Sequence, residues 1–274
     1  MDSAYLHLLR AQIRAQTQYR ASFVMEVVSN SIITAMDVGA VLVLFHVTPS
    51  LAGFGVRQVL VMTGLASTAF ALTDLTVGNI DTMRVYIRNG MFDAVLLRPL
   101  RVLPQLVFRD FTLRRTGRVA NGVAILAIAL SLVDIHWTLG RVVLLVMAPL
   151  FGAVIFGSVF VAGSTLAFWF VESGEFANAF TYGGRDFTLY PVGIYPGWFR
   201  ALFAYGLGFA FVGYFPGLAL LGEPDPLGAP AFFAWCSPLV AMAAAATATS
   251  GEHQAANAGA PNGSGSPSRA RPGK

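Results

Sequence analysis

The chain has 274 residues, of which 55% are hydrophobic and only 12% are charged, and its formal net charge is +4. Soluble globular domains carry roughly a quarter charged residues, so this composition excludes an ordinary soluble domain and indicates a chain that lies mostly in lipid. The arginines are not pooled on one soluble segment, which argues against nucleic acid as a partner, and the single cysteine excludes an internal disulfide.

Six apolar segments are long enough to cross a membrane, for which a helix needs about 20 residues. They lie near residues 23–45, 59–78, 119–137, 142–171, 201–221 and 231–249. The sequence therefore predicts an all-α membrane protein with six transmembrane helices in one domain, residues 23–249. The fourth segment is long enough to tilt or to kink at Pro149.

The basic residues predict the orientation of these helices. They fall in the N-terminal segment, between the second and third spans, after the fourth span (Arg185 and Arg200) and in the C-terminal tail. Of the 18 basic residues, only Arg57 and Arg141 lie on the other side. Because Lys and Arg stay preferentially on the cytoplasmic side, both termini are predicted to be cytoplasmic, in the plasma membrane of a bacterial cell.

Two terminal segments are not expected to span the membrane. In residues 1–22, apolar side chains recur at helical spacing (Leu6, Leu9 and Ile13) with arginines on another face. This pattern predicts an amphipathic interfacial helix that lies on the lipid of the inner membrane surface. Residues 250–274 are rich in Ala, Gly, Ser, Pro and Asn, so they cannot bury enough apolar surface to fold, and they are predicted to be a disordered cytoplasmic tail.

Polar residues recur at helical spacing inside the first two spans. The set comprises Glu26, Asn30, Thr34 and Asp37 in the first span and Thr63, Ser67 and Asp74 in the second. An acid in mid-span costs about 2.5–3.5 kcal/mol, so Asp37 is expected to face protein or water. These faces are candidates either to line a path for a polar or cationic substrate or to form hydrogen bonds between packed helices. Packing is favoured for Glu26, and Asp74 is expected to be solvated near the end of its span.

Several kinds of chemistry are missing from the sequence. No phosphate-binding loop exists, because the only lysine is Lys274. The four histidines are too scattered to form a metal site, and no serine lies beside a buried histidine as a membrane protease would need. The sequence therefore predicts a protein that is not an enzyme, with no catalytic residue, cofactor or metal.

The long stretch between the second and third spans carries a recognisable signature. Residues 88–100 read RNGMFDAVLLRPL, which resembles the G-x-x-D-x-x-L-x-[KR]-P-L signature of one branch of bacterial ABC-2 type permeases. Residues 187–191, 195–200 and 214–222 match the same branch in kind. The resemblance implies a six-helix subunit that pairs with a second permease, identical or related. Two cytoplasmic ATP-binding subunits would then power the export of a compound that is often drug-like or lipid-like.

The resemblance also implies a coupling helix that contacts the ATP-binding subunit. It maps onto residues 81–99 within a cytoplasmic loop, residues 81–117. The matching positions are Arg88, Gly90, Asp93, Arg98 and Pro99. This loop mixes arginines with apolar residues, and a loop of that composition is expected to dock on a partner. One departure is that the basic, Tyr-containing C-terminal motif of the family is missing, so the C-terminal contribution to the ATPase contact is in doubt.

Two alternatives stay open on the sequence. The first is an ion- or proton-coupled secondary carrier with Asp37 as the titrating group, although such carriers usually show internal repeats and none is evident here. The second is a membrane assembly factor or sensor that transports nothing. Dependence on ATP separates the first from an exporter, and the identity of the partners separates the second.

Overall fold

The computed structural model describes residues 20–78, 115–165 and 174–259. Regular structure in these ranges is helical, apart from an isolated bridge between Leu51 and Phe54. The all-α prediction is therefore confirmed for the described part of the chain. The predicted interfacial helix lies outside the described residues except at its very end, and so do all the predicted coupling residues, Arg88, Gly90, Asp93, Arg98 and Pro99.

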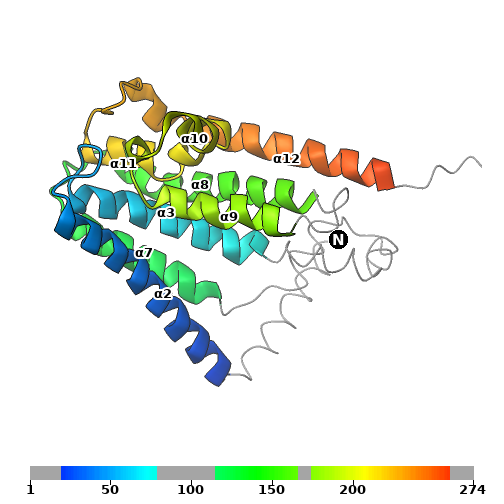
Figure 1. The fold of residues 1–274 in the computed structure, drawn as a ribbon, viewed down its shortest axis with the longest axis horizontal. Coiled ribbons are helices and arrows are strands. Elements are labelled where there is room, and N and C mark those ends of the chain that lie inside the picture. The colour runs from blue at the N-terminus through cyan, green and yellow to red at the C-terminus, as the bar shows by residue number, and fades with distance from the viewer. Residues whose placement is uncertain (1–19, 79–114, 166–173, 260–274) are drawn as a thin grey trace, which may run out of the picture.

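The described residues form six long helices, joined by short helices and turns. The long helices are α2 (Arg20–Val47), α3 (Val56–Val77), α7 (Thr116–Ser131), α8 (Leu139–Thr165), α9 (Gly174–Thr188) and α12 (Ser237–Gly259). They run in alternating directions between two ends of an elongated bundle (Figure 1). The end where α2 begins and α12 finishes, on the right in Figure 1, is called the near end, and the opposite end is called the far end.

Three helices contain stretches long and apolar enough to cross a membrane: Val27–Val47, Val56–Val77 and Leu139–Gly163. A bent pair, Gly197–Gly206 with Phe209–Leu221, adds a fourth crossing if it counts as one span. α7 is apolar but shorter. The chain is therefore a multi-pass membrane protein by composition and helix length, whereas the number of six spans stays a prediction.

The segment predicted to span the membrane at residues 201–221 is a broken helix, and the break lies at Gly208. The chain forms a π-helical segment (Ala201–Gly206), turns at Gly208 with a left-handed φ of 76°, and continues as a short 3-10 helix (Phe209–Phe211) and as α11 (Tyr214–Leu221). The two arms of this segment are bent by 62°. Hydropathy stays high throughout this segment, so it gives no sign of the break. The turn itself depends on Gly208, because only a glycine adopts this backbone conformation without strain.

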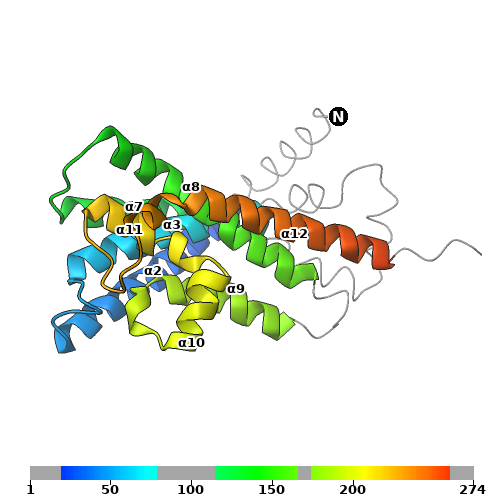
Figure 2. The same ribbon diagram turned by 90° about the horizontal axis from the view of Figure 1, so that it is seen from above.

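The fifth passage between the ends of the bundle is made instead by α9. This helix runs from the near end to the far end against α3 and α8 (Figures 1 and 2). The sequence had assigned this stretch to a loop because it carries charged residues among apolar ones. As a result, Arg185 lies on a helix of the bundle, where it binds Asp37 of α2, rather than in a loop.

The core is built where α8 and α11 pack against α3. Phe156 and Phe209 are almost fully buried, and their ring centroids are 5.1 Å apart. α11 approaches α3 through two glycines: a Cβ atom added at Gly213 would come within 2.8 Å of the Met62 carbonyl oxygen, and one at Gly217 within 2.8 Å of the Met62 side chain. Small residues at this spacing allow helices to approach closely, so this contact fixes the bent segment against the bundle.

The C-terminal boundary differs from the prediction. α12 continues to Gly259, so the first part of the segment expected to be disordered, residues 250–274, is helical. The prediction of disorder was based only on how little apolar surface this segment can bury. Ala has the highest helix propensity, and extending an existing helix avoids the cost of nucleation. Residues 260–274 lie outside the described residues.

Candidate functional site

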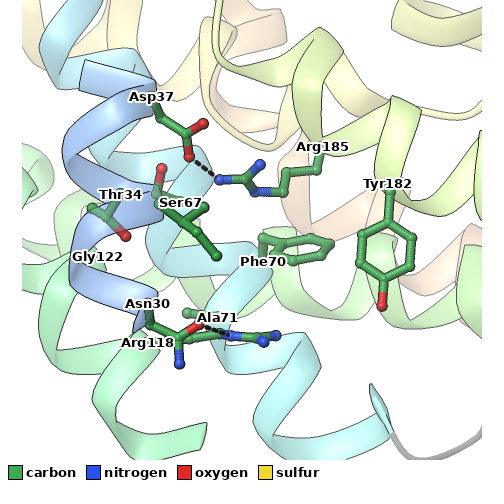
Figure 3. A pocket seen from close by; sticks show the side chains of 11 residues that line it. Asn30, Thr34, Asp37, Ser67, Phe70, Ala71, Arg118, Gly122, Tyr182 and Arg185 are labelled. Atoms are coloured by element: carbon green, nitrogen blue, oxygen red, sulfur yellow. Dashed lines mark hydrogen bonds and ion pairs between the residues drawn. The ribbon is translucent and has the colours of Figure 1, made fainter. Parts of the chain in front are cut away.

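A cavity of about 250 Å³ lies between α2, α3, α7 and α9. Its polar lining consists of Asn30, Thr34, Asp37, Ser67, Arg118 and Arg185. The rings of Phe70 and Tyr182 line it as well, and Figure 3 shows Phe70 between the two arginines. The cavity is therefore a charged and aromatic compartment inside an otherwise apolar bundle.

Four of the predicted path residues meet in this cavity. Asn30, Thr34 and Asp37 share one face of α2, as their spacing of four and three residues indicated, and Ser67 faces them from α3. Asp74 lies beside the cavity, bound to the lining residue Arg118. Glu26 lies on α2, but its side chain is outside the described residues.

At one side of the cavity, the Asp37 carboxylate accepts a hydrogen bond from the Arg185 guanidinium, which crosses over from α9 (Figure 3). Arg185 also contacts Asp186 at 3.1 Å, and its guanidinium carbon lies 5.6 Å from the centroid of the Phe70 ring. The side chains of Arg185 and Asp37 keep exposed fractions of 21% and 22%. The mid-span acid is thus neutralised by a cation from α9, and both side chains keep part of their surface open to the cavity.

At the other side of the cavity, Asp74 is bound by two arginines. Arg118 Nη1 lies 2.7 Å from Asp74 Oδ2, and Arg115 Nη1 lies 3.1 Å from Oδ1 and 2.6 Å from the Asp74 carbonyl oxygen. Arg118 Nε donates to Asn30 Oδ1 at 2.8 Å. These four residues, Asn30, Asp74, Arg115 and Arg118, are called the Asp74 cluster; they join α2, α3 and the start of α7.

The expectation that Asp74 is solvated is wrong. Asp74 is only 3% exposed, because α7 begins beside the end of α3 and places two guanidinium groups on its carboxylate. Burying an unpaired carboxylate is costly, whereas a buried charge with paired hydrogen-bonding partners is tolerated. Asp74 is therefore a fixed, paired anion.

The sequence analysis missed four residues of this site: Phe70, Arg118, Tyr182 and Arg185. Arg118 and Arg185 had been used only as markers of membrane orientation. A signal was present for Arg185. Asp37 needs a counter-cation within the membrane, and Asn178, Tyr182 and Arg185 repeat the helical spacing of four and three residues that marks the facing side of α2. Their spacing could therefore have indicated a partner helix.

Several aromatic side chains pack together at the C-terminal end of α9. Phe187 stacks on Tyr195 with ring centroids 4.3 Å apart, and Phe199 stacks on Phe203 at 4.4 Å. Burial first, and then the negative charges of Asp37 and Asp186, raise the pKa of Tyr190, which follows α9. This tyrosine therefore stays a neutral hydroxyl at physiological pH.

Within residues 20–78, 115–165 and 174–259, no three acidic, histidine or cysteine side chains are placed to hold a metal ion.

Membrane-length apolar helices around an internal polar cavity define this chain as a multi-pass helical membrane protein. The sequence matches the family described as ABC-2 family transporter protein over residues 31–250, and the chain belongs to this family. The matched region contains α3, α7, α8 and α9 and all but one of the polar cavity residues. No curated protein and no solved structure matches the chain.

Proposed function

We propose that this chain is the permease subunit of an ABC-2 type exporter of the plasma membrane. It forms the translocation path with a second permease, identical or related, and a separate ATP-binding subunit supplies the energy. The observation that carries the proposal is the family match over residues 31–250. The charged cavity inside the matched region supports it, because a transport path through a bilayer needs polar groups that face away from lipid.

The proposal places the ATP-binding subunit at the near end of the bundle. Residues 79–114 connect the near end of α3 to the near end of α7, and they contain the coupling signature, with Arg88, Gly90, Asp93, Arg98 and Pro99 as the proposed contacts. α2 begins and α12 finishes at this same end (Figure 1), which agrees with two cytoplasmic termini. Among the described residues, Arg20 begins α2, and Arg115 and Arg118 lie at the start of α7, so these three lie at the near end. Arg185 and Arg200 do not mark this end, because α9 carries the chain away from it.

The same cavity informs the choice between mechanisms. Asp37 and Asp74 are both bound by arginines, so neither is an isolated acid inside the membrane. A carrier that titrates Asp37 would first have to break the contact with Arg185. We therefore propose a path for a polar substrate that is not specifically cationic, driven by a partner ATPase rather than by protonation of Asp37.

The experiment is a purification of the chain from its native host in mild detergent, followed by identification of the co-purifying proteins by mass spectrometry. A soluble ATPase is expected in the complex. Shuffling residues 90–93 should abolish its recovery while the permease still elutes as a folded protein. The matched control shuffles residues 262–265, which lie beyond the family match, and should retain the ATPase. Absence of any ATPase from the parent complex would overturn the proposal.

A further inference from the structure

We infer that the Asp74 cluster is a coupling joint, which transmits movement of the segment between α3 and α7 to the α2 wall of the cavity. The inference rests on the proposed function, because it assigns the transmission step between an ATP-driven contact and the translocation path. Asn30, Asp74, Arg115 and Arg118 are positioning residues in this account, and none of them carries out chemistry.

The Asp74 cluster lies at the end of α3 and at the start of α7. Asp74 is on the last turn of α3, which ends at Val77, and Arg115 and Arg118 flank the start of α7 at Thr116. These are the two places where residues 79–114 join the described bundle. Because both arginines bind the same carboxylate, they connect the two ends of that segment into one unit, and these ends will move together.

Arg118 also reaches from this unit to α2. Its Nη1 holds Asp74 at 2.7 Å while its Nε holds Asn30 Oδ1 at 2.8 Å. The planar guanidinium presents Nε and Nη1 as two separate donors in a fixed geometry, whereas the donors of an ammonium group all lie on one nitrogen. Asn30 is 6% exposed, and it lies one turn before Thr34 and two turns before Asp37 on the cavity face. A displacement of α7 is therefore passed directly to the residues that line the cavity.

The next residue of α2, Ser31, also forms side-chain hydrogen bonds to α7. Ser31 exchanges hydrogen bonds with Asn121, which is also on α7, at 3.1 and 3.3 Å. In Figure 1, α2 diverges from α3 toward the near end. The polar contacts that hold this part of α2 are thus made to α7, so α2 follows α7 rather than α3 when the two separate.

The Arg115 side chain occupies space beside Gly78 at the end of α3. Gly78 caps the end of α3 in a right-handed helical conformation, with φ of −60° and ψ of −15°, so backbone freedom does not demand a glycine here. A Cβ atom at this position would overlap the Arg115 guanidinium. The absence of a side chain at Gly78 is what allows Arg115 to lie on Asp74.

The test measures how nucleotide binding changes access to the cavity. The sole cysteine is removed (Cys236→Ser) and a reporter is placed in the cavity (Thr34→Cys). The purified permease–ATPase complex is reconstituted in lipid nanodiscs. The rate of maleimide labelling is measured without nucleotide and with ATP and vanadate, which traps the ATPase. In the parent complex the ratio of the two rates should differ clearly from one.

Arg118→Gln should bring this ratio to one while the ATPase still co-purifies, since the joint is cut but the docking segment is intact. Arg118→Lys should restore the contact with Asp74 without the bridge to Asn30, and the ratio should stay near one. Gly78→Ala keeps every polar side chain and should give an intermediate ratio, so it decides the matter if Arg118→Gln does not fold. Arg57→Gln, on the exposed far end of α3, should match the parent.

A parent-like ratio in folded Arg118→Gln would overturn the joint and leave the exporter assignment standing. Loss of the ATPase from Arg118→Gln would assign Arg118 to docking and would also overturn the joint. A parent chain that recovers no ATPase would overturn the proposed function and the joint together.

Discussion

The two charged groups that border the cavity use the same residue types and differ in burial and in redundancy. The Asp74 side chain is 4% exposed and is held by two arginines, whereas the Asp37 side chain is 22% exposed and, among the described residues, is held by Arg185. Arg185 is also shared with Asp186, whose side chain is 68% exposed. One carboxylate is therefore locked, and the other lines the cavity and shares its arginine with a competing anion.

The difference shows that an acid in a membrane helix does not have a role fixed by its type. Removing one partner from a buried pair leaves an uncompensated charge, which costs about 3–5 kcal/mol, whereas exposed pairs contribute about 0–1 kcal/mol. The Asp74 cluster has the properties of a rigid connection. The pair of Asp37 and Arg185 has those of a contact that can exchange its partners as the cavity changes shape.

The largest effect is expected for Asp74→Asn. The substitution leaves two guanidinium groups facing a neutral amide in a buried site, so the free energy of unfolding should fall by about 3–5 kcal/mol. Equilibrium unfolding in detergent, followed by tryptophan fluorescence, measures the change. Asp134→Asn makes the same chemical change at an exposed position and should stay close to the parent. Equal stability of the two variants would remove the distinction between the locked and the exchangeable acid.

Asp37→Asn should have a smaller effect, about 1–2 kcal/mol, because the pair lies between the exposed and the buried cases. A double-mutant cycle with Arg185→Gln isolates the contact between the two side chains. The coupling free energy should be of the same size as the single effect and should shrink in high salt, because the pair is partly exposed where it lines the cavity. A coupling as large as the loss in Asp74→Asn would mean that both acids are locked.

The sequence predicted one half of this site well. The spacing of Asn30, Thr34 and Asp37 on one helix defines a face by geometry alone, and the structure places that face on the cavity. The helix type and the approximate limits of α2, α3, α7 and α8 also followed from long apolar segments. These features depend on local periodicity, which a single sequence records directly.

The other half of the site depends on contacts between distant segments. Arg118 lies 44 residues from Asp74 along the chain, and Arg185 lies 148 residues from Asp37. Nothing local distinguishes Arg118 from the arginines that mark orientation, whereas Arg185 shares a helical face with Asn178 and Tyr182. α9 was missed for a related reason: its charge is balanced by a neighbouring helix, so its own hydropathy does not indicate that it runs through the bundle.

Gly78→Ala should cost about 1 kcal/mol, less than Asp74→Asn, because the added Cβ displaces Arg115 and crowds Asp74 Oδ1 but removes no charged group. The matched control is Gly39→Ala on α2, where no atom lies within 4 Å of the added Cβ. That control should gain up to about 1 kcal/mol, since Ala favours a helix over Gly. Thermal unfolding in one detergent compares the two. Opposite signs would show that the space at Gly78 serves the cluster.

The smallest effect is expected for Asp186→Asn. Its carboxylate contacts Arg185 at 3.1 Å but is largely exposed, so the loss should stay below about 0.5 kcal/mol in the same unfolding assay. The variant should, however, increase the coupling between Asp37 and Arg185 in the double-mutant cycle, because the competing anion has been removed. If Asp186→Asn is instead as destabilising as Asp37→Asn, then Asp186 is the principal partner of Arg185. The far side of the cavity would then hold an acid, Asp37, that Arg185 does not neutralise.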